Sequence, residues 1–426
     1  MTALVVGGGL AGLVAGYRLA QAGRAVNVLE SGPQLGGMIG RVELGGVTVD
    51  SGAEAYAVRG VVRELCDELG LEVQGPAGQP HVWWPDGSWP MAQGVLGIPA
   101  SVEDPALGAL SDDDAEQLAG DLTLGPEVGA DAVSVGELVR ARMGQGAVDK
   151  LVAPVAKGVY SLDPDRMPLA AFAPGLVSAV AEHGSLMAAV AAVRGPGAAA
   201  VEQPVGGMFR LIDALADAIV EHGGQIRRGA TATGVKRLGA AFAVALTDGE
   251  MLEAEQLVLA TPAAVTAALV ERLGVTFAVP PVKTARLAMF SVRSAELAAG
   301  PVGSGLLVGE PDPSIHAKAL THYSVKWPWS RREDQEIIRL SYPDQFLPNR
   351  AEVVADASRF LGVDIDDDAI TGFASVGWES LPGRLEASTH EYLLQGFAEA
   401  GIDVVGAWLD GNGIASVVAG CSRVLR

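Results

Sequence analysis

The fold of this chain is decided by the stretch TALVVGGGLAGLVAGYRLAQAGRAVNVLE, which runs from Thr2 to Glu30. It opens with a short apolar run that ends at glycine, a pattern typical of a buried parallel strand. Apolar residues then recur at helical spacing from Leu13 to Ala22, where Gly23 ends the helix, and a second apolar run leads to Glu30. The stretch therefore predicts a strand, a turn, a helix and another strand.

Three glycines in the turn have the spacing of a dinucleotide-binding motif. Gly7, Gly9 and Gly12 stand at the G-x-G-x-x-G positions, where they allow a tight turn, a close approach of pyrophosphate to the backbone, and close packing of helix on strand. Glu30 ends the second strand, where a carboxylate can accept a hydrogen bond from a ribose 2′-hydroxyl. The glycines alone would also fit a turn in an ordinary α/β protein, but the whole unit favours a dinucleotide.

Length and charge limit the classes of function. A chain of 426 residues is too long for one hydrophobic core and suits two or three domains. Its formal net charge is −21, which excludes nucleic acid as a partner because binding to phosphates needs a basic surface. The same charge disfavours attraction to anionic lipid.

Cysteine and histidine usage indicates a cytoplasmic protein without a metal site. Cys66 and Cys421 are the only cysteines, too few for a disulfide framework, and the six histidines show no metal-ligand spacing. The apolar run near the amino end belongs to the predicted strand and helix rather than to a signal peptide. The longest other apolar stretch, residues 170–181, contains Pro174 and Gly175 and falls short of the roughly 20 residues of a membrane span. We therefore expect no stable membrane insertion.

The remaining chain alternates between strand-rich and helix-rich segments. Strands are predicted at 42–50 and 81–90, each as a hairpin, and at 225–227, 241–246, 257–260, 285–293, 305–308, 318–324 and 336–342. Helices are predicted at 61–69, 134–143, 147–156, 209–221 and 415–425. Ser111 is predicted to cap a further helix, so we expect residues 101–202 to form a helical insertion.

Motifs beyond the first unit carry a family resemblance. With Gly36-Gly37 just after Glu30, the chain resembles the FAD-binding superfamily of amine oxidases, phytoene desaturases and protoporphyrinogen oxidases. It is most similar to the protoporphyrinogen oxidase family, and within it to the bacterial coproporphyrinogen III oxidases. The motifs of this resemblance are Val135 to Val139, Leu151 through Pro154 to Gly158-Val159-Tyr160, Ser324 to Pro328, Trp378 through Leu381-Pro382, and Asp410 to Ile414.

The resemblance implies an α/β fold with a discontinuous, Rossmann-type FAD-binding domain, a mixed-sheet substrate domain and a helical insertion. The FAD-binding domain would comprise residues 1–56, 203–264 and 388–426. The substrate-binding domain would comprise 57–100 and 265–387, and the helical insertion domain 101–202.

The cofactor implied by the resemblance is FAD. Its predicted contacts are Gly7, Gly9, Leu10, Ala11, Gly12, Glu30, Ser31, Gly36, Gly37, Met38, Val235, Thr261, Asn412, Gly413 and Ile414. Three positions depart from the family pattern. Met38 stands where a basic residue is common, with Arg41 as an alternative contact; Asn412 replaces an apolar residue, and Ala415 replaces a proline.

The chemistry implied by the resemblance is the six-electron oxidation of a porphyrinogen to a porphyrin. Three two-electron steps would pass through the flavin, and O₂ would reoxidise it with release of H₂O₂. The motifs identify no catalytic acid or base. Arg59, Lys157 and Lys326 are candidate ligands for the substrate's propionates, although each also fits a solvated surface cation.

Other functions stay open at this level. Protoporphyrinogen IX could be the substrate in place of coproporphyrinogen III, although a soluble protein suits the tetracarboxylate better. An FAD amine oxidase shares the amino-terminal unit. A flavin-bound porphyrin-binding protein without activity, handing porphyrin to the next haem-pathway enzyme, is the alternative from another class. Transient contact with that next enzyme is also expected of the active oxidase.

Overall fold

The computed structural model describes residues 2–58, 60–160, 162–194, 201–382 and 385–425. The chain has a mixed α/β fold and divides into two compact units. Unit 1 comprises Met1–Gly75, Ala199–Leu287 and Val376–Arg426, and unit 2 comprises Pro76–Ala198 and Ala288–Ser375. The division into FAD-binding, substrate-binding and insertion domains stays a prediction.

Unit 1 is built on a parallel sheet of five strands. Their order is β10 (Gln225–Arg228), β2 (Ala25–Glu30), β1 (Thr2–Val6), β14 (Gln256–Leu259) and β20 (Asp403–Val404). Every neighbouring pair is parallel. Alternate residues of β1 join two different cores, Ala3 and Val5 on one face and Leu4 and Val6 on the other. Burial on both faces explains why β1 is a continuous apolar run.

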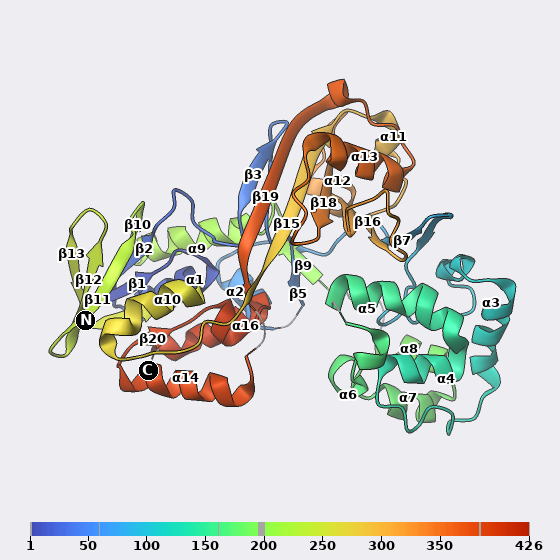
Figure 1. Cartoon of the computed structure of the whole chain (residues 1–426), viewed down its shortest axis with the longest axis horizontal. Coiled ribbons are helices and arrows are strands. Elements are labelled where there is room, and N and C mark those ends of the chain that lie inside the picture. Colours follow the sequence, from blue (N-terminus) through green and yellow to red (C-terminus); the bar gives the residue numbers. More distant parts are fainter. Residues whose placement is uncertain (1, 59, 161, 195–200, 383–384, 426) are drawn as a thin grey trace. The chain divides into compact units, whose positions relative to one another are not determined.

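Helices cover one face of this sheet, and a second sheet covers the other (Figure 1). The first face packs against α1 (Leu10–Gln21), α2 (Val61–Glu68), α9 (Phe209–Glu221) and α16 (Ile414–Gly420). The second face packs against the antiparallel sheet of β11 (Ala232–Leu238), β12 (Ala241–Leu246) and β13 (Met251–Ala254), and against α10 (Ala263–Val270) and α14 (Ala387–Glu399). The sheet is therefore the middle layer of three.

Short connections complete unit 1. They are the hairpin of β3 (Arg41–Leu44) and β4 (Val47–Asp50), the small sheet of β5 (Tyr56–Ala57), β9 (Val201–Pro204) and β6 (Val73–Gln74), and the turns η5 (Glu271–Leu273), α15 (Ala407–Asp410) and η8 (Cys421–Leu425). The fully buried Asp50 ends β4 and accepts hydrogen bonds from the backbone N–H groups of Met208 and Phe209, at 3.0 and 3.1 Å. A distant side chain thus caps α9.

The larger sheet has seven strands, most of whose residues belong to unit 2. Its order is β19 (Ile370–Pro382), β15 (Val282–Val292), β18 (Glu336–Tyr342), β17 (Ala319–His322), β16 (Gly305–Val308), β7 (His81–Trp84) and β8 (Gly87–Pro90). β16 and β7 are parallel, so the sheet is mixed. Helix α13 (Arg350–Leu361) packs on it, and α11 (Ala295–Ala298), α12 (Tyr323–Lys326), η6 (Pro328–Ser330) and η7 (Asp367–Ala369) connect its strands.

Residues 105–194 form the helical part of unit 2, and α3 to α8 gather into one body (Figure 1). Its helices are α3 (Asp112–Ala119), α4 (Val135–Ala147), α5 (Ala153–Tyr160), α6 (Leu169–Phe172), α7 (Leu176–His183) and α8 (Leu186–Arg194), joined by η1 (Pro105–Ala109), η2 (Gly120–Thr123), η3 (Val148–Val152) and η4 (Pro164–Arg166). Ser111 caps α3, as predicted. A core of aliphatic side chains lies between them.

A buried ion pair crosses this helical part. Arg142 of α4 and Asp121 of η2 have no exposed side-chain surface, and Nε of Arg142 lies 2.5 Å from Oδ1 of Asp121. The Asp121 carboxylate also accepts from the backbone N–H groups of Leu186 and Met187, at the start of α8. Arg142 donates as well to the carbonyl groups of Gly125, Val128 and Gly184. One pair therefore fixes three separate segments.

Many predicted elements are confirmed, and a few were wrong or missed. Helix α9 and strands β12, β16 and β18 have the predicted bounds, and both hairpins form. The strand predicted at 318–324 ends at His322, because Ser324 Oγ binds Glu336 and the N–H of Ile337 and the chain turns into α12. The predicted helix at 147–156 opens with a π-helical turn. Strands β13 and β19 and helices α10, α13 and α14 were not predicted.

No single helix among the described ranges has both the length and the apolar character of a membrane span. Helices α7 and α8 together meet the length and composition criteria, but they are bent by 115° at the break between them. Leu176 and Leu186, the first residues of these two helices, are buried in the core of the helical part.

Candidate cofactor site

Four predicted cofactor segments follow the carboxyl ends of adjacent parallel strands in unit 1. The glycine turn follows β1, Glu30 ends β2, Thr261 follows β14, and the segment that contains Gly413 follows β20. In a parallel sheet these ends lie at one edge, where ligands of open α/β sheets bind. We call this edge, from β2 to β20, the carboxyl edge.

Gly7, in the β1–α1 turn, and Gly12, in the first turn of α1, are required by contacts within the chain. A Cβ atom on Gly7 would lie 2.4 Å from the carbonyl oxygen of Ala260, and Gly7 has a φ of +111°. A Cβ atom on Gly12 would lie 1.8 Å from the carbonyl oxygen of Gly7. The missing side chains thus let α1 pack directly on β1 and β14.

The third glycine leaves space that the described protein does not fill. A Cβ atom on Gly9 would find no neighbour closer than Cα of Gly37, at 3.9 Å. Gly9 also precedes α1, which begins at Leu10 with no side-chain cap and no acidic residue in its first turn. The N–H groups of that turn, together with the helix dipole, favour an anion. This geometry fits a pyrophosphate passing over Gly9, with Leu10, Ala11 and Gly12 in the first turn.

Glu30 is held by backbone groups at the end of β2. Its Oε2 accepts from the N–H of Gly8 at 2.8 Å, and its Oε1 accepts from the N–H of Gly32 at 2.6 Å and from Ser31 Oγ at 3.2 Å. A carboxylate offers about four acceptor positions. One position therefore stays available to a ribose hydroxyl, and the side chain is only partly buried.

The Gly36-Gly37 segment lies directly against the glycine turn. The N–H of Gly36 donates to the carbonyl of Gly8 at 2.9 Å, and both glycines have positive φ angles, +111° and +57°. Met38 is partly buried, and its carbonyl accepts from the N–H of Ala53 at 3.0 Å. These residues stay near the turn, as a cofactor contact requires.

Arg41, the alternative to Met38, is occupied by α9. Its Nη1 donates to Asp213 Oδ2 at 2.9 Å, and the guanidinium lies 5.0 Å from the centre of the Phe209 ring. Both partners belong to α9, whose start Asp50 caps. Arg41 therefore fastens the β3–β4 hairpin to that helix.

The segments after β14 and β20 complete the carboxyl edge. The carbonyl of Thr261 accepts from Trp408 Nε1 at 3.1 Å. Helix α16 begins after Gly413 without a side-chain cap, with Asn412 exposed and Ile414 partly buried beside it. The thiol of Cys421 donates to the carbonyl of Ala11 at 3.3 Å, which joins the carboxyl-terminal segment to α1.

The side chain of Val235, a predicted cofactor contact, does not lie at the carboxyl edge. It lies on β11 and is fully buried among Leu4, Leu29 and Val244, in the core between the two sheets of unit 1. Only its backbone is left for a contact with the cofactor.

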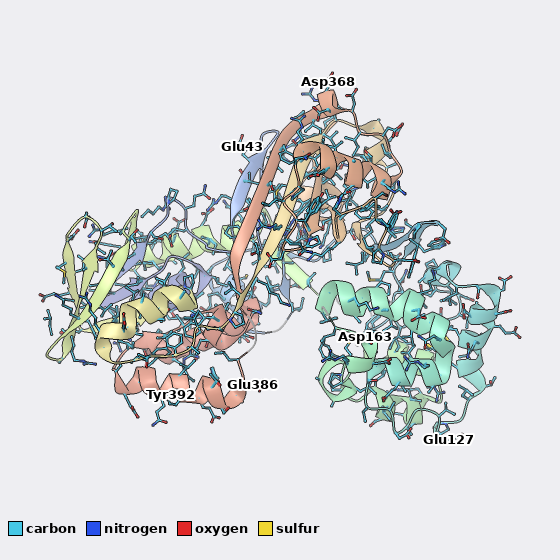
Figure 2. The ribbon with its side chains drawn as sticks, in the orientation of Figure 1. Glu43, Glu127, Asp163, Asp368, Glu386 and Tyr392 are labelled. Carbon is cyan, nitrogen blue, oxygen red and sulfur yellow. The ribbon has the colours of Figure 1, made fainter. Side chains whose placement is uncertain are left out.

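The three predicted substrate cations differ in how the structure describes them. Arg59 lies outside the described residues. Lys157, near the end of α5, has a side chain that is 64% exposed, and its Nζ lies 4.0 Å from Asp163, which Figure 2 labels. Lys326 ends α12, and its Nζ lies 5.4 Å from the centre of the Trp327 ring. Both lysines belong to unit 2, but no described contact joins Lys157 to Lys326.

Sequence reasoning missed the group that holds the Lys326 segment. Glu336 is 2% exposed at the start of β18, and its carboxylate accepts from Ser324 Oγ at 2.5 Å and lies 3.1 Å from Nε2 of His322. Burial raises the pKa of Glu336, but the hydrogen bonds from His322 and Ser324 outweigh burial and hold that pKa below its usual value. The only hint in the sequence is an acidic residue at the start of an apolar strand.

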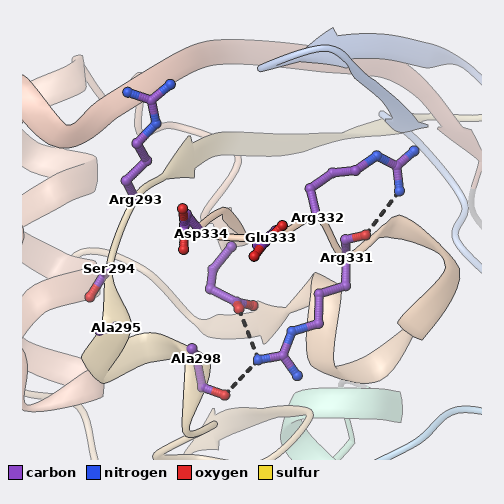
Figure 3. Close-up of a pocket in the computed structure, with 9 residues that line it drawn as sticks. Arg293, Ser294, Ala295, Ala298, Arg331, Arg332, Glu333 and Asp334 are labelled. Carbon is purple, nitrogen blue, oxygen red and sulfur yellow. Dashed lines mark hydrogen bonds and ion pairs between the residues drawn. The ribbon is translucent and has the colours of Figure 1, made fainter.

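Arg331 approaches the other oxygen of Glu336, and both residues line a pocket of about 550 Å³ (Figure 3). The distance from Nη2 of Arg331 to Oε1 of Glu336 is 3.2 Å. Arg293 and Arg332 also line the pocket, together with the acidic Glu333 and Asp334. The charges of this pocket therefore balance within its own lining.

Comparisons with known proteins find a family model, relatives and a solved structure that are similar to this chain. A family model described as flavin containing amine oxidoreductase matches residues 10–288. The chain is 28% identical to a coproporphyrinogen III oxidase of Mycobacterium tuberculosis, with 99% of this chain and 96% of that protein covered. It is 25% identical to a coproporphyrinogen III oxidase of Bacillus subtilis, with 79% and 76% covered. A crystal structure from Exiguobacterium sp. 255-15, assigned as a protoporphyrinogen oxidase, shares the fold with a TM-score of 0.80 at 21% identity, covering 100% of this chain and 98% of that one.

Proposed function

The chain belongs to the flavin-containing amine oxidoreductase family, and we propose that it oxidises coproporphyrinogen III to coproporphyrin III in haem biosynthesis. FAD is the cofactor, and in this proposal O₂ is the final electron acceptor. The substrate would lose six electrons and six protons in three steps, and three molecules of O₂ would take them up as H₂O₂. The observation that carries the proposal is the end-to-end similarity to relatives named for this reaction.

We assign FAD to the carboxyl edge of unit 1, within a Rossmann-type domain of residues 1–56, 203–264 and 388–426. The flavin, when bound, supplies the acceptor of an electron pair at each step. The first turn of α1 would bind the pyrophosphate through its N–H groups, and Glu30 would accept from the ribose. Gly413, at the start of α16, would lie near the end of the cofactor that gains negative charge.

The protein would bind a tetracarboxylate although its own charge is −21. Acidic residues lie across the surface of both units, for example Glu43 and Asp368 (Figure 2). A substrate with four negative groups therefore needs local cations along its approach. Lys157 and Lys326, with Arg59, are the candidates for this role, in a substrate domain of residues 57–100 and 265–387 with the helical insertion of 101–202.

The described residues include no group that the geometry identifies as a base for the pyrrolic protons. Water or a backbone carbonyl can accept those protons, because loss of the hydride makes the pyrrole N–H groups acidic. In this proposal the chain contributes by binding, orienting and shielding the substrate rather than by proton transfer at a single side chain.

A fluorescence assay tests the proposal. Purified, flavin-loaded protein in air should convert non-fluorescent coproporphyrinogen III into fluorescent coproporphyrin III, with about three H₂O₂ per porphyrin if flavin is reoxidised by O₂. Offering protoporphyrinogen IX in the same mixture measures the preference between the two substrates. Putrescine or another amine serves as the amine oxidase control.

Anaerobic mixing separates an enzyme from a porphyrin-binding protein without activity. Coproporphyrinogen III should bleach the yellow absorbance of the flavin when no O₂ is present. A flavin that stays yellow while the porphyrinogen binds would refute the proposed oxidation. Bleaching by an amine but not by porphyrinogen would favour an amine oxidase.

A further inference from the structure

A second pocket, of about 330 Å³, lies within unit 2 beside the segment that carries Lys326. We call it the Arg194 pocket; its lining is Gly78 to Pro80, Met91 to Gly94, and Arg194. No acidic residue belongs to this lining, in a chain with 51 acidic and 30 basic residues. A pocket whose only charged lining residue is a cation favours an anionic ligand.

The amide side chains of the pocket are oriented by one another. Gln79 Nε2 donates to the carbonyl of Met91 at 3.0 Å, and Gln93 Nε2 donates to Gln79 Oε1 at 3.2 Å. Each amide nitrogen has two hydrogens, so each keeps a second donor. The lining of the pocket therefore includes amide N–H donors as well as the cation Arg194.

The acid that binds the Gln93 segment, Asp104, is already used by the backbone. Asp104 is 8% exposed, and its carboxylate accepts from the N–H groups of Gln93 and Ala106, at 2.8 and 3.0 Å. Because both oxygens serve backbone donors, this carboxylate fixes the Gln93 loop and does not line the pocket. Arg194 itself is exposed at the end of α8 and has no ion pair among the described contacts.

The pocket is joined to the predicted substrate segment. The N–H of Ala77 donates to the carbonyl of Lys326 at 2.9 Å. A Cβ atom on Gly78 would lie 3.1 Å from Val325, so the wall of the pocket packs against α12. Residues 77–78 thus contact the segment that carries Lys326, and Gly78 lines the same pocket as Arg194.

We propose that the Arg194 pocket binds one carboxylate of the porphyrinogen, with the Arg194 guanidinium as the charged donor and the amides of Gln79 and Gln93 beside it. This inference rests on the proposed function, since the tetracarboxylate is its ligand. A guanidinium can hold a carboxylate through two parallel hydrogen bonds, which fixes the ligand's orientation as well as its charge. The larger pocket of Figure 3 does not compete for this role, because its own acids neutralise its arginines.

An arginine at the end of a helix has an ordinary explanation that the test must exclude. Cations in the last turn stabilise a helix through its dipole, without any ligand. Arg272 offers a matched control, because it is also an exposed arginine at the end of a helical segment, in the turn η5 that follows α10, and lies in unit 1. Both alanine variants lose one positive charge.

The test is titration of flavin-loaded, full-length protein with coproporphyrin III, followed by porphyrin fluorescence. We expect Arg194→Ala to raise the Kd roughly tenfold, equal to about 1.4 kcal/mol, while Arg272→Ala leaves it unchanged. Arg194→Lys should recover part of the affinity, because it restores the charge without the paired donors. The salt dependence of the Kd should also weaken in Arg194→Ala, since one screened charge pair is lost.

An unchanged Kd in Arg194→Ala, or an equal rise in Arg272→Ala, would overturn the assignment of this pocket. The outcome is separable from that of the proposed function, because binding of the porphyrin needs no turnover. If wild type and Arg194→Ala both oxidise porphyrinogen with equal KM, the carboxylate assignment of the Arg194 pocket is refuted and the proposed function is retained. If binding of the porphyrin depends on Arg194 but no porphyrinogen is oxidised, the assignment of the pocket is retained and the proposed function is refuted.

Discussion

The carboxyl edge of unit 1 and the helical part of unit 2 order their polar groups in opposite ways. At the edge, Gly7 and Gly12 let the chain pack closely, and Gly9 leaves open space in front of the uncapped N–H groups of α1. In the helical part, Arg142 and Asp121 are fully buried and satisfied by each other and by backbone groups. Donors without a protein partner are suited to a ligand, whereas a closed network of partners is suited to structure.

The difference predicts where substitutions act. A side chain added to the edge competes with packing or with the cofactor, according to which glycine is replaced. A partner removed from the helical part leaves a buried charge, which is costly wherever the cofactor lies. Four experiments examine this contrast.

Gly12→Val should have the largest effect. Its Cβ atom would lie 1.8 Å from the carbonyl oxygen of Gly7, a backbone atom that cannot move aside without separating α1 from β1. We expect a loss of stability above about 4 kcal/mol, with little flavin retained. The ratio of flavin absorbance to protein and the far-UV circular dichroism spectrum measure both effects.

Gly234→Val is the control for Gly12→Val. Gly234 lies on β11, where a Cβ atom would meet nothing within 4 Å, and valine suits a strand. This variant should keep its flavin. A Gly12→Val protein with one flavin per chain would show that the turn adopts another geometry.

Arg142→Met should destabilise the helical part and leave the cofactor bound. The substitution leaves the Asp121 carboxylate buried with only the N–H groups of Leu186 and Met187. Breaking a buried pair costs about 3–5 kcal/mol. Thermal melting followed by circular dichroism should show an early transition, before flavin fluorescence reports release of the cofactor.

Arg140→Met is the control two residues away. Arg140 pairs with Asp165 at 2.9 Å, but both side chains are well exposed, at 37% and 50%. An exposed pair contributes about 0–1 kcal/mol. Equal melting temperatures of Arg142→Met and Arg140→Met would mean that the buried pair stabilises the protein no more than the exposed pair.

The same contrast explains what could be predicted from the sequence. The glycine turn and Glu30 are local, so their spacing alone predicted the strand, helix and strand that the structure contains. The Arg142 pair joins residues 21 positions apart and reaches α8, 65 positions from Asp121, so no local pattern identifies it. Asp50, the cap of α9, is 158 positions from Met208 and was equally invisible.

Two of the missed elements, β19 and α14, have causes of their own. β19 runs for 13 residues, but it contains Gly377 and Trp378 and shows no regular alternation of apolar and polar residues. Helix α14 has only Leu393 and Phe397 buried, so its apolar stripe is narrow. In the site, the Glu336 carboxylate was missed because its partners lie on other elements, β17 and α12.

Gly9→Ala is a smaller change that tests the edge itself. Its Cβ atom would meet no protein atom closer than 3.9 Å, so the chain should fold with its stability nearly unchanged. If a pyrophosphate passes over this residue, the added methyl group should raise the Kd for FAD roughly tenfold, or about 1.4 kcal/mol. Reconstitution of apoprotein with FAD, followed by quenching of flavin fluorescence, gives that constant. An unaltered Kd for FAD would show that the cofactor does not pass over Gly9.

The thiols of Cys66 and Cys421 both lie in unit 1, so their rate of alkylation reports on unit 1 alone. We expect this experiment to show the smallest effect of the four. Burial raises the pKa of the Cys66 thiol to about 11 and that of Cys421 to about 12. At pH 8 a thiol of pKa 11 is about one part in a thousand thiolate, the form that reacts with iodoacetamide. Native protein should therefore label slowly, and each rise in pH should increase the rate up to about pH 11.

Labelling should respond to the edge and not to the helical part. Cys421 donates to the carbonyl of Ala11 in α1, so Gly12→Val should expose it and bring labelling near the rate of a free thiol. Arg142→Met should label at the wild-type rate below its first melting transition, since the described hydrogen-bond partners of Arg142 lie in the helical part, which contains neither cysteine. Mass spectrometry of alkylated protein over time measures both rates. Fast labelling of Arg142→Met would mean that loss of the buried pair also opens unit 1, and that the two regions do not unfold independently.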